Sequence, residues 1–349
     1  MAETKISIEN LYKIFGLRPE SVLPDVQQGM SKQDLLEKHN HVLGLKDINI
    51  DVAARELSVI MGLSGSGKST LIRHINRLIE PTSGRIVVNG QDVLAMDKDE
   101  LIKFRRYGVS MVFQKFGLHV HKTVGENAAY GLMIQGKPIE EARQKSRKWL
   151  DRVGLSGFED HYPSQLSGGM QQRVGLARAL ATDAEILLMD EPFSALDPLI
   201  RTDMQAVLLG LQEELHKTIV FITHDLDEAL RLGDSIAILR DGAVIQQGNP
   251  QDIILHPADD YIFDFIKDIN RSRVIESKSV MTPGESVDGP NLPHDLVLEE
   301  ALQIVGAVPS SQGNVVDEDK RVIGSISLKQ IIDGIARPVE SSDPDVRYR

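Results

Sequence analysis

The chain has 349 residues and a formal net charge of −12 at pH 7, with 41% hydrophobic and 26% charged residues. This balance is typical of a folded protein of about two domains, and its acidity argues against extended contact with nucleic acid, which needs a basic surface. The chain has no cysteine, which excludes disulfides and cysteine nucleophiles, and no apolar run approaches the roughly 18 residues that span a bilayer, so we expect any membrane link to pass through a partner.

The first part of the chain predicts two strands separated by an insertion. Residues 5–14 alternate apolar and polar side chains, and strand character resumes at 46–52. The segment 17–44 between them holds two prolines and a helix-like stretch at 31–38, where a tight turn would suffice to join the strands. We therefore interpret 17–44 as an insertion.

A glycine-rich loop follows the next predicted strand. The apolar run 57–61 precedes it, and apolar residues at helical spacing over 71–79 follow it. The loop fits the pattern G-x-x-x-x-G-K-[ST], whose glycines let backbone N–H groups wrap around phosphate oxygens. Lys68 would reach the β- and γ-phosphates and Ser69 would offer its hydroxyl to Mg²⁺. The predicted nucleotide-binding residues are Gly62, Leu63, Ser64, Gly65, Ser66, Gly67, Lys68, Ser69 and Thr70.

The next elements continue the alternation of strands and helices. Residues 84–88 with Asn89-Gly90 predict a hairpin with a type I′ turn. Strands alternating with helices favour a parallel α/β sheet. The pattern predicts helices over 97–106, 139–153 and 203–216, buried strands over 185–190 and 218–223, and two short strands within 234–246.

Two acids end the predicted strand at 185–190. Asp190 is placed to hold Mg²⁺, and Glu191 could polarise an attacking water as a general base. Strands that merely end in acids are common, so this interpretation depends on the motifs that accompany it.

A second glycine pair begins the next clear helix. Ser167, Gly168 and Gly169 precede a helical run at 174–180 and form a second candidate anion-binding surface. With this Leu-Ser-Gly-Gly motif, the chain resembles the ATP-binding subunits of ABC transporters over about residues 6–270. In that family two subunits sandwich two ATP molecules, each between one subunit's phosphate loop and the other's Leu-Ser-Gly-Gly motif. The resemblance therefore implies a homodimer.

The remaining family elements occur in order. Gln114 follows a strand at 109–113 and corresponds to the glutamine that reaches Mg²⁺ and couples to the permease. Asp197 lies in the loop that touches the opposite subunit, and His224 matches the histidine that contacts the γ-phosphate. The resemblance thus implies the catalytic residues Glu191, His224, Gln114 and Lys68 and the metal ligands Ser69, Gln114 and Asp190.

Two positions depart from the family pattern or leave it open. Met170 stands where the commonest signature has glutamine, although the expected contacts come from the serine and the glycine backbone. The family stacks adenine on an aromatic residue after the first strand, and both Tyr12 and Phe15 are candidates. Phe15, followed by Gly16, fits the usual pattern better, although core packing is an alternative role for either ring.

The resemblance implies an α/β fold, a P-loop NTPase of ABC type with an antiparallel β subdomain and a helical subdomain. A smaller C-terminal α+β unit, with helices at 298–305 and 328–335, resembles one cystathionine-β-synthase (CBS) motif. Such motifs work in pairs, so we expect pairing across the dimer; a tail without regulatory role is the alternative. The expected domains are 1–270 for ATP binding (17–44 insertion, about 115–180 helical subdomain), a linker at 271–291, a single CBS-like motif at 292–336 and a flexible tail at 337–349.

The insertion and the segments 76–82 and 193–201 narrow the resemblance to the ATPase subunits of glycine betaine, L-proline and choline importers. It implies ATP hydrolysis with Mg²⁺, driving import of a quaternary amine, with another small solute such as an amino acid as the alternative. The implied partners are integral-membrane permease subunits and, indirectly, a substrate-binding protein, with the chain peripheral on the cytoplasmic face of the cell (inner) membrane. An ABC ATPase acting on DNA or ribosomes would usually need two fused nucleotide domains or a basic face, and an intact Glu191 and His224 argue against a non-hydrolytic regulatory module.

Overall fold

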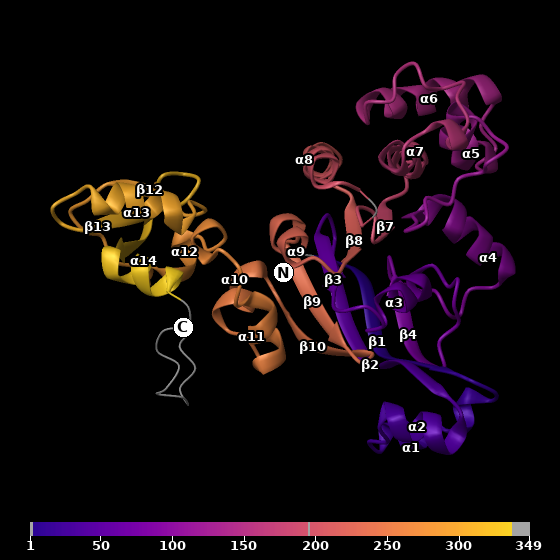
Figure 1. The fold of residues 1–349 in the computed structure, drawn as a ribbon, viewed down its shortest axis with the longest axis horizontal. Coiled ribbons are helices and arrows are strands. Elements are labelled where there is room, and N and C mark those ends of the chain that lie inside the picture. The colour runs from indigo at the N-terminus through magenta and orange to yellow at the C-terminus, as the bar shows by residue number, and fades with distance from the viewer. Residues whose placement is uncertain (1–2, 195, 337–349) are drawn as a thin grey trace. The chain divides into compact units, whose positions relative to one another are not determined.

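The computed structural model describes residues 3–194 and 196–336 (Figure 1). The chain divides into two compact units, Met1–Gln247 and Gly248–Arg349. The larger unit contains two sheets and the smaller one contains a third sheet. Among the described residues, none of the helices combines the length and apolarity needed to cross a membrane.

The central sheet of the larger unit has the strand order β10-β9-β3-β8-β7-β6. Neighbouring strands from β9 to β6 run parallel, and every residue of β3, β7 and β8 is buried, as expected for continuous apolar runs covered on both faces. The strands are β3 (Leu57–Met61), β6 (Val109–Val112), β7 (Ile186–Asp190), β8 (Thr218–Thr223), β9 (Ser235–Arg240) and β10 (Ala243–Gly248). The predicted parallel α/β sheet is therefore confirmed.

A second, antiparallel sheet has the order β2-β1-β4-β5. Its strands are β1 (Thr4–Phe15), β2 (Val42–Ala53), β4 (Ser83–Val88) and β5 (Gln91–Asp92). Asn89 and Gly90 have φ of 51° and 74°, and this pair of positive angles matches the predicted type I′ turn between β4 and β5. One apolar core cluster joins buried residues of both sheets with Leu71, Ile72 and Ile75.

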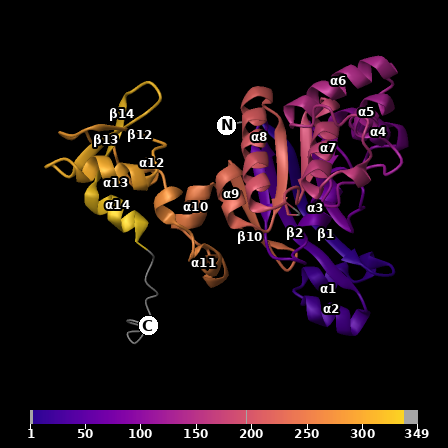
Figure 2. The same cartoon turned by 45° about the horizontal axis from the view of Figure 1, so that its top comes forward.

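Figure 2 shows the helices of the larger unit. The insertion folds as α1 (Leu23–Gln27) and α2 (Lys32–His39), and α3 (Lys68–Ile75) follows the glycine loop. The helices α5 (Val124–Ile134), α6 (Ile139–Arg152) and α7 (Gly168–Ala181) pack on one another. The others are α4 (Lys98–Lys103), α8 (Pro198–Leu215) and α9 (Leu226–Leu232). The helix α8 begins five residues before the predicted 203 because Asp197 caps it and Pro198 occupies its first turn.

The smaller unit is built on the sheet β11-β14-β13-β12. Parallel β12 and β13 are followed by antiparallel β14. Its elements are α10 (Pro250–Leu255), α11 (Asp260–Ile266), α12 (Ser277–Val280), β11 (Thr282–Pro283), β12 (Asn291–Pro293), α13 (Leu298–Gly306), β13 (Gln312–Val316), β14 (Val322–Ser327) and α14 (Leu328–Ile335).

The contacts of Arg271 explain why this unit begins before the sequence placed it. Its buried guanidinium donates to the carbonyl oxygens of Ile254 in α10, at 3.2 Å, and Gly334 in α14, at 3.0 Å. These bonds tie α10 to α14, whereas the sequence assigned residues up to 270 to the ATP-binding domain. The expected linker also contains α12 and β11, and β11 pairs with β14. The expected tail, 337–349, lies outside the described residues.

Candidate functional site

The glycine loop leaves the buried strand β3 and ends where α3 begins. Gly67 adopts a left-handed conformation, with φ of 105°, immediately before Lys68 opens the helix. A side chain at Gly62 would collide with the carbonyl oxygen of Leu239, and one at Gly67 would meet that of Gly44. Glycine is therefore required at both positions by conformation and by space.

The Lys68 side chain reaches back across the loop, and its ammonium bonds to carbonyl oxygens at the loop's start. Its Nζ donates to the carbonyl oxygens of Gly62, at 2.7 Å, and Leu63, at 3.0 Å, and lies 3.8 Å from Glu191 Oε1. The side chain is 4% exposed. Burial lowers the pKa of Lys68, while Glu191 and Asp190 act in the opposite direction. The lysine is thus a desolvated cation held beside the cradle of backbone N–H groups.

Asp190 ends β7 in full burial. Its Oδ1 accepts a bond from the Ser69 hydroxyl at 2.7 Å, and its Oδ2 accepts one from Arg73 Nη2 at 3.0 Å. The structure therefore brings together two of the three predicted metal ligands, Ser69 from α3 and Asp190 from the end of β7. Hydroxyl and carboxylate oxygens are the donors that Mg²⁺ prefers.

Glu191 is the point on which the other predicted catalytic residues converge. Its Oε2 accepts a bond from Gln114 Nε2 at 2.8 Å and lies 3.4 Å from His224 Nδ1. Glu191 has a φ of 44°, unusual for a side-chain-bearing residue, and its N–H donates to Ile222 of β8. This strained backbone turns the carboxylate out of the strand end toward Lys68, Gln114 and His224.

A pocket of about 330 Å³ lies over the loop. Its lining includes Phe15 at the end of β1. Phe15 is 41% exposed, and Lys13 Nζ lies 5.0 Å from the centroid of its ring. Tyr12 is buried in an apolar cluster and does not line the pocket. The other lining residues are Lys32, Val42, Leu43, Gly44, Ser64, Gly65, Gly67, Lys68, Ser69, Thr70, Gln114 and Glu191.

The Leu-Ser-Gly-Gly segment does not line this pocket. Ser167 caps α7, accepting a bond from the N–H of Met170 at 3.3 Å, and a side chain at Gly169 would contact Leu196 and Ile200. Asp197 caps the neighbouring α8 through the N–H of Ile200. The predicted residues Ser167, Gly168, Gly169 and Asp197 therefore form a second group outside the loop pocket.

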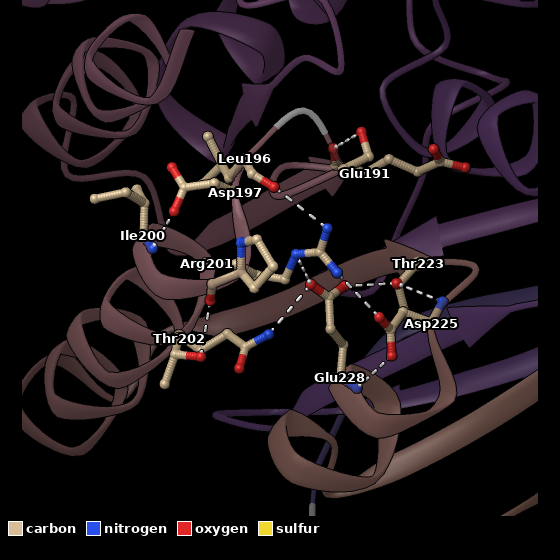
Figure 3. A network of polar contacts seen from close by, with 12 residues as sticks. Glu191, Leu196, Asp197, Ile200, Arg201, Thr202, Thr223, Asp225 and Glu228 are labelled. Atoms are coloured by element: carbon tan, nitrogen blue, oxygen red, sulfur yellow. Dashed lines mark hydrogen bonds and ion pairs between the residues drawn. The ribbon is translucent and has the colours of Figure 1, made fainter. Parts of the chain in front are cut away.

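A polar network links the loop after Glu191 to the loop that carries His224 (Figure 3). Arg201 donates to Asp225 Oδ2 at 3.2 Å and to the carbonyl oxygen of Leu196 at 3.4 Å. Buried Glu228 lies 3.8 Å from Arg201 Nε and accepts the Thr223 hydroxyl bond at 2.6 Å. Burial raises the pKa of the Glu228 carboxyl. Sequence reasoning missed this network, because no local pattern shows that Arg201, at the end of the segment 193–201, meets Glu228.

The strand–loop–helix, with acids at the end of β7 in the same sheet, defines the class as a P-loop nucleotide-binding protein. Residues 45–194 match a family model described as ABC transporter. The chain is 48% identical to a glycine betaine/carnitine transport ATP-binding protein of Listeria monocytogenes, over 94% of this chain and 82% of that protein. It is 44% identical to a glycine betaine/proline betaine transport system ATP-binding protein of Escherichia coli, over 94% and 82%.

A solved structure agrees with these relatives. It is a dimeric post-hydrolysis ATP-binding cassette bound to ADP and Pi, similar to this chain with a TM-score of 0.60 and 34% identity, over 70% of this chain and 98% of that one. The chain belongs to the ABC transporter ATP-binding subunits, in the glycine betaine, proline betaine and choline uptake family. The predicted resemblance is confirmed, as is the ABC-type P-loop fold with its antiparallel sheet.

Proposed function

We propose that this chain is the ATP-hydrolysing subunit of an ABC importer for a quaternary amine such as glycine betaine, proline betaine or choline. The supporting observation is the convergence of Lys68, Gln114 and His224 on Glu191. The named cargoes of the relatives support the substrate class. An importer for another small solute is the second candidate.

Glu191 would act as the general base. It takes a proton from water as the water oxygen attacks the γ-phosphorus, and the bond to the β,γ-bridging oxygen breaks to release ADP and phosphate. Lys68 would stabilise charge on the β- and γ-phosphates, and His224 would contact the γ-phosphate. Phe15, which faces the pocket, would stack on adenine.

The oxygen donors of the site suit a magnesium ion. Ser69 and Asp190 lie within hydrogen-bond distance of each other, and Gln114 lines the same pocket. These three residues would hold Mg²⁺, which would supply charge neutralisation to the phosphates when bound.

The second group of predicted residues would complete the site from another copy of the chain. Ser167, Gly168 and Gly169 lie outside the loop pocket, which suits the homodimer, with Asp197 at the contact between the copies. The dimeric cassette among the similar structures supports this arrangement. The dimer would act on permease subunits at the cytoplasmic face of the membrane and, indirectly, on a substrate-binding protein.

The test is ATP hydrolysis by the chain assembled with its membrane partners. Quaternary amines should stimulate phosphate release and amino acids should not. The variant Lys68→Ala should lose ATP binding, which ties the activity to this site. Stimulation by an amino acid alone would favour the second candidate, and an assembled complex with no ATP-dependent phosphate release would refute the proposal.

The smaller unit would be a single CBS-like motif that pairs across the dimer. The order β12, α13, β13, β14, α14 supports it, and Ile304 of α13 and Ile332 of α14 are 39% and 51% exposed. Exposed apolar side chains on both helices suit a pairing surface. Changing Ile332 to Glu should weaken the dimer and alter the response of ATPase activity to salt; no change in either would contradict the pairing.

A further inference from the structure

The insertion forms a small module fixed to the end of β1. Val26 of α1 and Leu35 of α2 are fully buried in a cluster with Tyr12, Ile14 and Leu43 from the antiparallel sheet. Because its own apolar residues are buried against both strands, the module is held in place at the edge of the nucleotide pocket.

The His41 side chain contacts the backbone at both ends of this module. Its ring nitrogens lie 2.8 Å from the carbonyl oxygen of Leu17 and 2.6 Å from that of His39, and the side chain is 8% exposed. A side chain at Gly16 would collide with the His41 ring. The imidazole therefore packs directly behind the backbone that follows Phe15.

Lys32 is the residue through which the module lines the pocket. It opens α2, whose N-cap Ser31 accepts a bond from the N–H of Asp34 at 3.0 Å, and it lines the pocket with Phe15 and Gly44. Phe15 pairs in register with Val42, so the start of β2 and the Phe15 ring form one wall.

The ammonium of Lys32 is held loosely. Its Nζ lies 3.8 Å from Asp241 Oδ1, and the two side chains are 42% and 75% exposed. An exposed pair at this distance contributes little and exchanges readily. The cation is therefore available to a ligand in the pocket.

We propose that the insertion forms a wall of the nucleotide site and that Lys32 donates a hydrogen bond to the adenine or ribose of ATP. This rests on the proposed function. Lys68 already serves the phosphate end, whereas Lys32 comes from the Phe15 side, where acceptor nitrogens of adenine and ribose oxygens would lie. A hydrogen bond from the Lys32 ammonium to a neutral acceptor of adenine or ribose strengthens the binding of ATP. It does not strengthen the binding of a triphosphate that lacks the nucleoside.

The test compares two probes, ATP and inorganic triphosphate, in calorimetric titrations without Mg²⁺. Lys32→Ala should weaken ATP binding about three- to tenfold, as expected for one partly exposed charged hydrogen bond, and leave triphosphate binding unchanged. Lys32→Arg, which keeps a charged donor, should retain ATP affinity. Lys38→Ala is the matched control, since Lys38 lies on the same helix, pairs with Asp34 at 2.8 Å and does not line the pocket.

Three outcomes would overturn the inference. If Lys32→Ala binds ATP as tightly as the wild type, the Lys32 ammonium does not contact adenine or ribose. If the variant loses triphosphate affinity as much as ATP affinity, the ammonium contacts the phosphates instead. An equal loss in Lys38→Ala would reduce the effect to general surface charge. If the wild-type chain does not bind ATP, the proposed function itself is refuted. That result differs from the other three, in which the wild-type chain binds ATP.

Discussion

His74 of α3 should make the larger unit unstable in mild acid. The side chain is fully buried, its Nδ1 lies 2.6 Å from the carbonyl oxygen of Thr70, and its Nε2 has no hydrogen-bond partner among the described residues. The pKa of His74 is lowered from 6.5 to about 4, chiefly by burial; Lys13 acts in the same direction, while the Thr70 carbonyl and Glu80 act in the opposite one. The folded protein therefore keeps the ring neutral where an unfolded chain would protonate it.

The size of the effect follows from these two pKa values. Between pH 6.5 and about 4 the unfolded chain binds one more proton than the folded chain, so stability falls as the pH falls. Proton linkage with these values gives a loss of about 2 kcal/mol between pH 7.5 and pH 5.0. Above pH 7 the histidine is neutral in both states and the contribution is fully present.

The assay is urea unfolding followed by the fluorescence of Trp149, the single tryptophan, which lies in the larger unit. His74→Leu removes the titrating ring and should lose about 2 kcal/mol less than the wild type on going from pH 7.5 to pH 5.0. His121→Gln changes an exposed histidine and should follow the wild type. Equal losses in wild type and His74→Leu would refute the reasoning.

Two further predictions concern the catalytic loops. Glu191→Gln should lower hydrolysis by about 10²–10⁴-fold while ATP remains bound and the closed dimer accumulates, seen by phosphate release and size-exclusion chromatography; undiminished hydrolysis would rule out the general base. Arg201→Met leaves buried Glu228 without its partly exposed cation, so it should cost about 1–3 kcal/mol in urea unfolding and lower turnover more than ATP affinity. Adding Glu228→Gln should recover part of both losses, because an amide needs no counter-charge, and a single variant with wild-type stability and turnover would exclude this positioning role.

Most of the nucleotide site could be predicted because its residues lie in short segments with fixed spacing. The loop from Gly62 to Thr70 and the two acids at the end of β7 each carry their own local pattern. Lys32 and Arg201 lie in segments that the sequence also singled out, but their contacts depend on how the insertion docks and how two loops meet. Such tertiary contacts are not encoded in local periodicity.

The choice between Tyr12 and Phe15 shows the same limit. Both lie in β1, and only the three-dimensional packing of the insertion buries Tyr12 while leaving Phe15 at the pocket. The unit boundary was also hidden, because the bonds of Arg271 that join α10 to α14 connect residues far apart in the chain. Burial and long-range contacts therefore decide what sequence patterns leave open.

The separation of Ser167 from the loop pocket has a thermodynamic consequence. If ATP is bound between two copies, nucleotide binding and subunit association are linked, and the apparent affinity for ATP must rise with the concentration of the chain. Permease subunits that hold two copies side by side would replace that dependence with a fixed effective concentration. An isolated chain in dilute solution would then understate the affinity that the same residues reach in the assembled transporter.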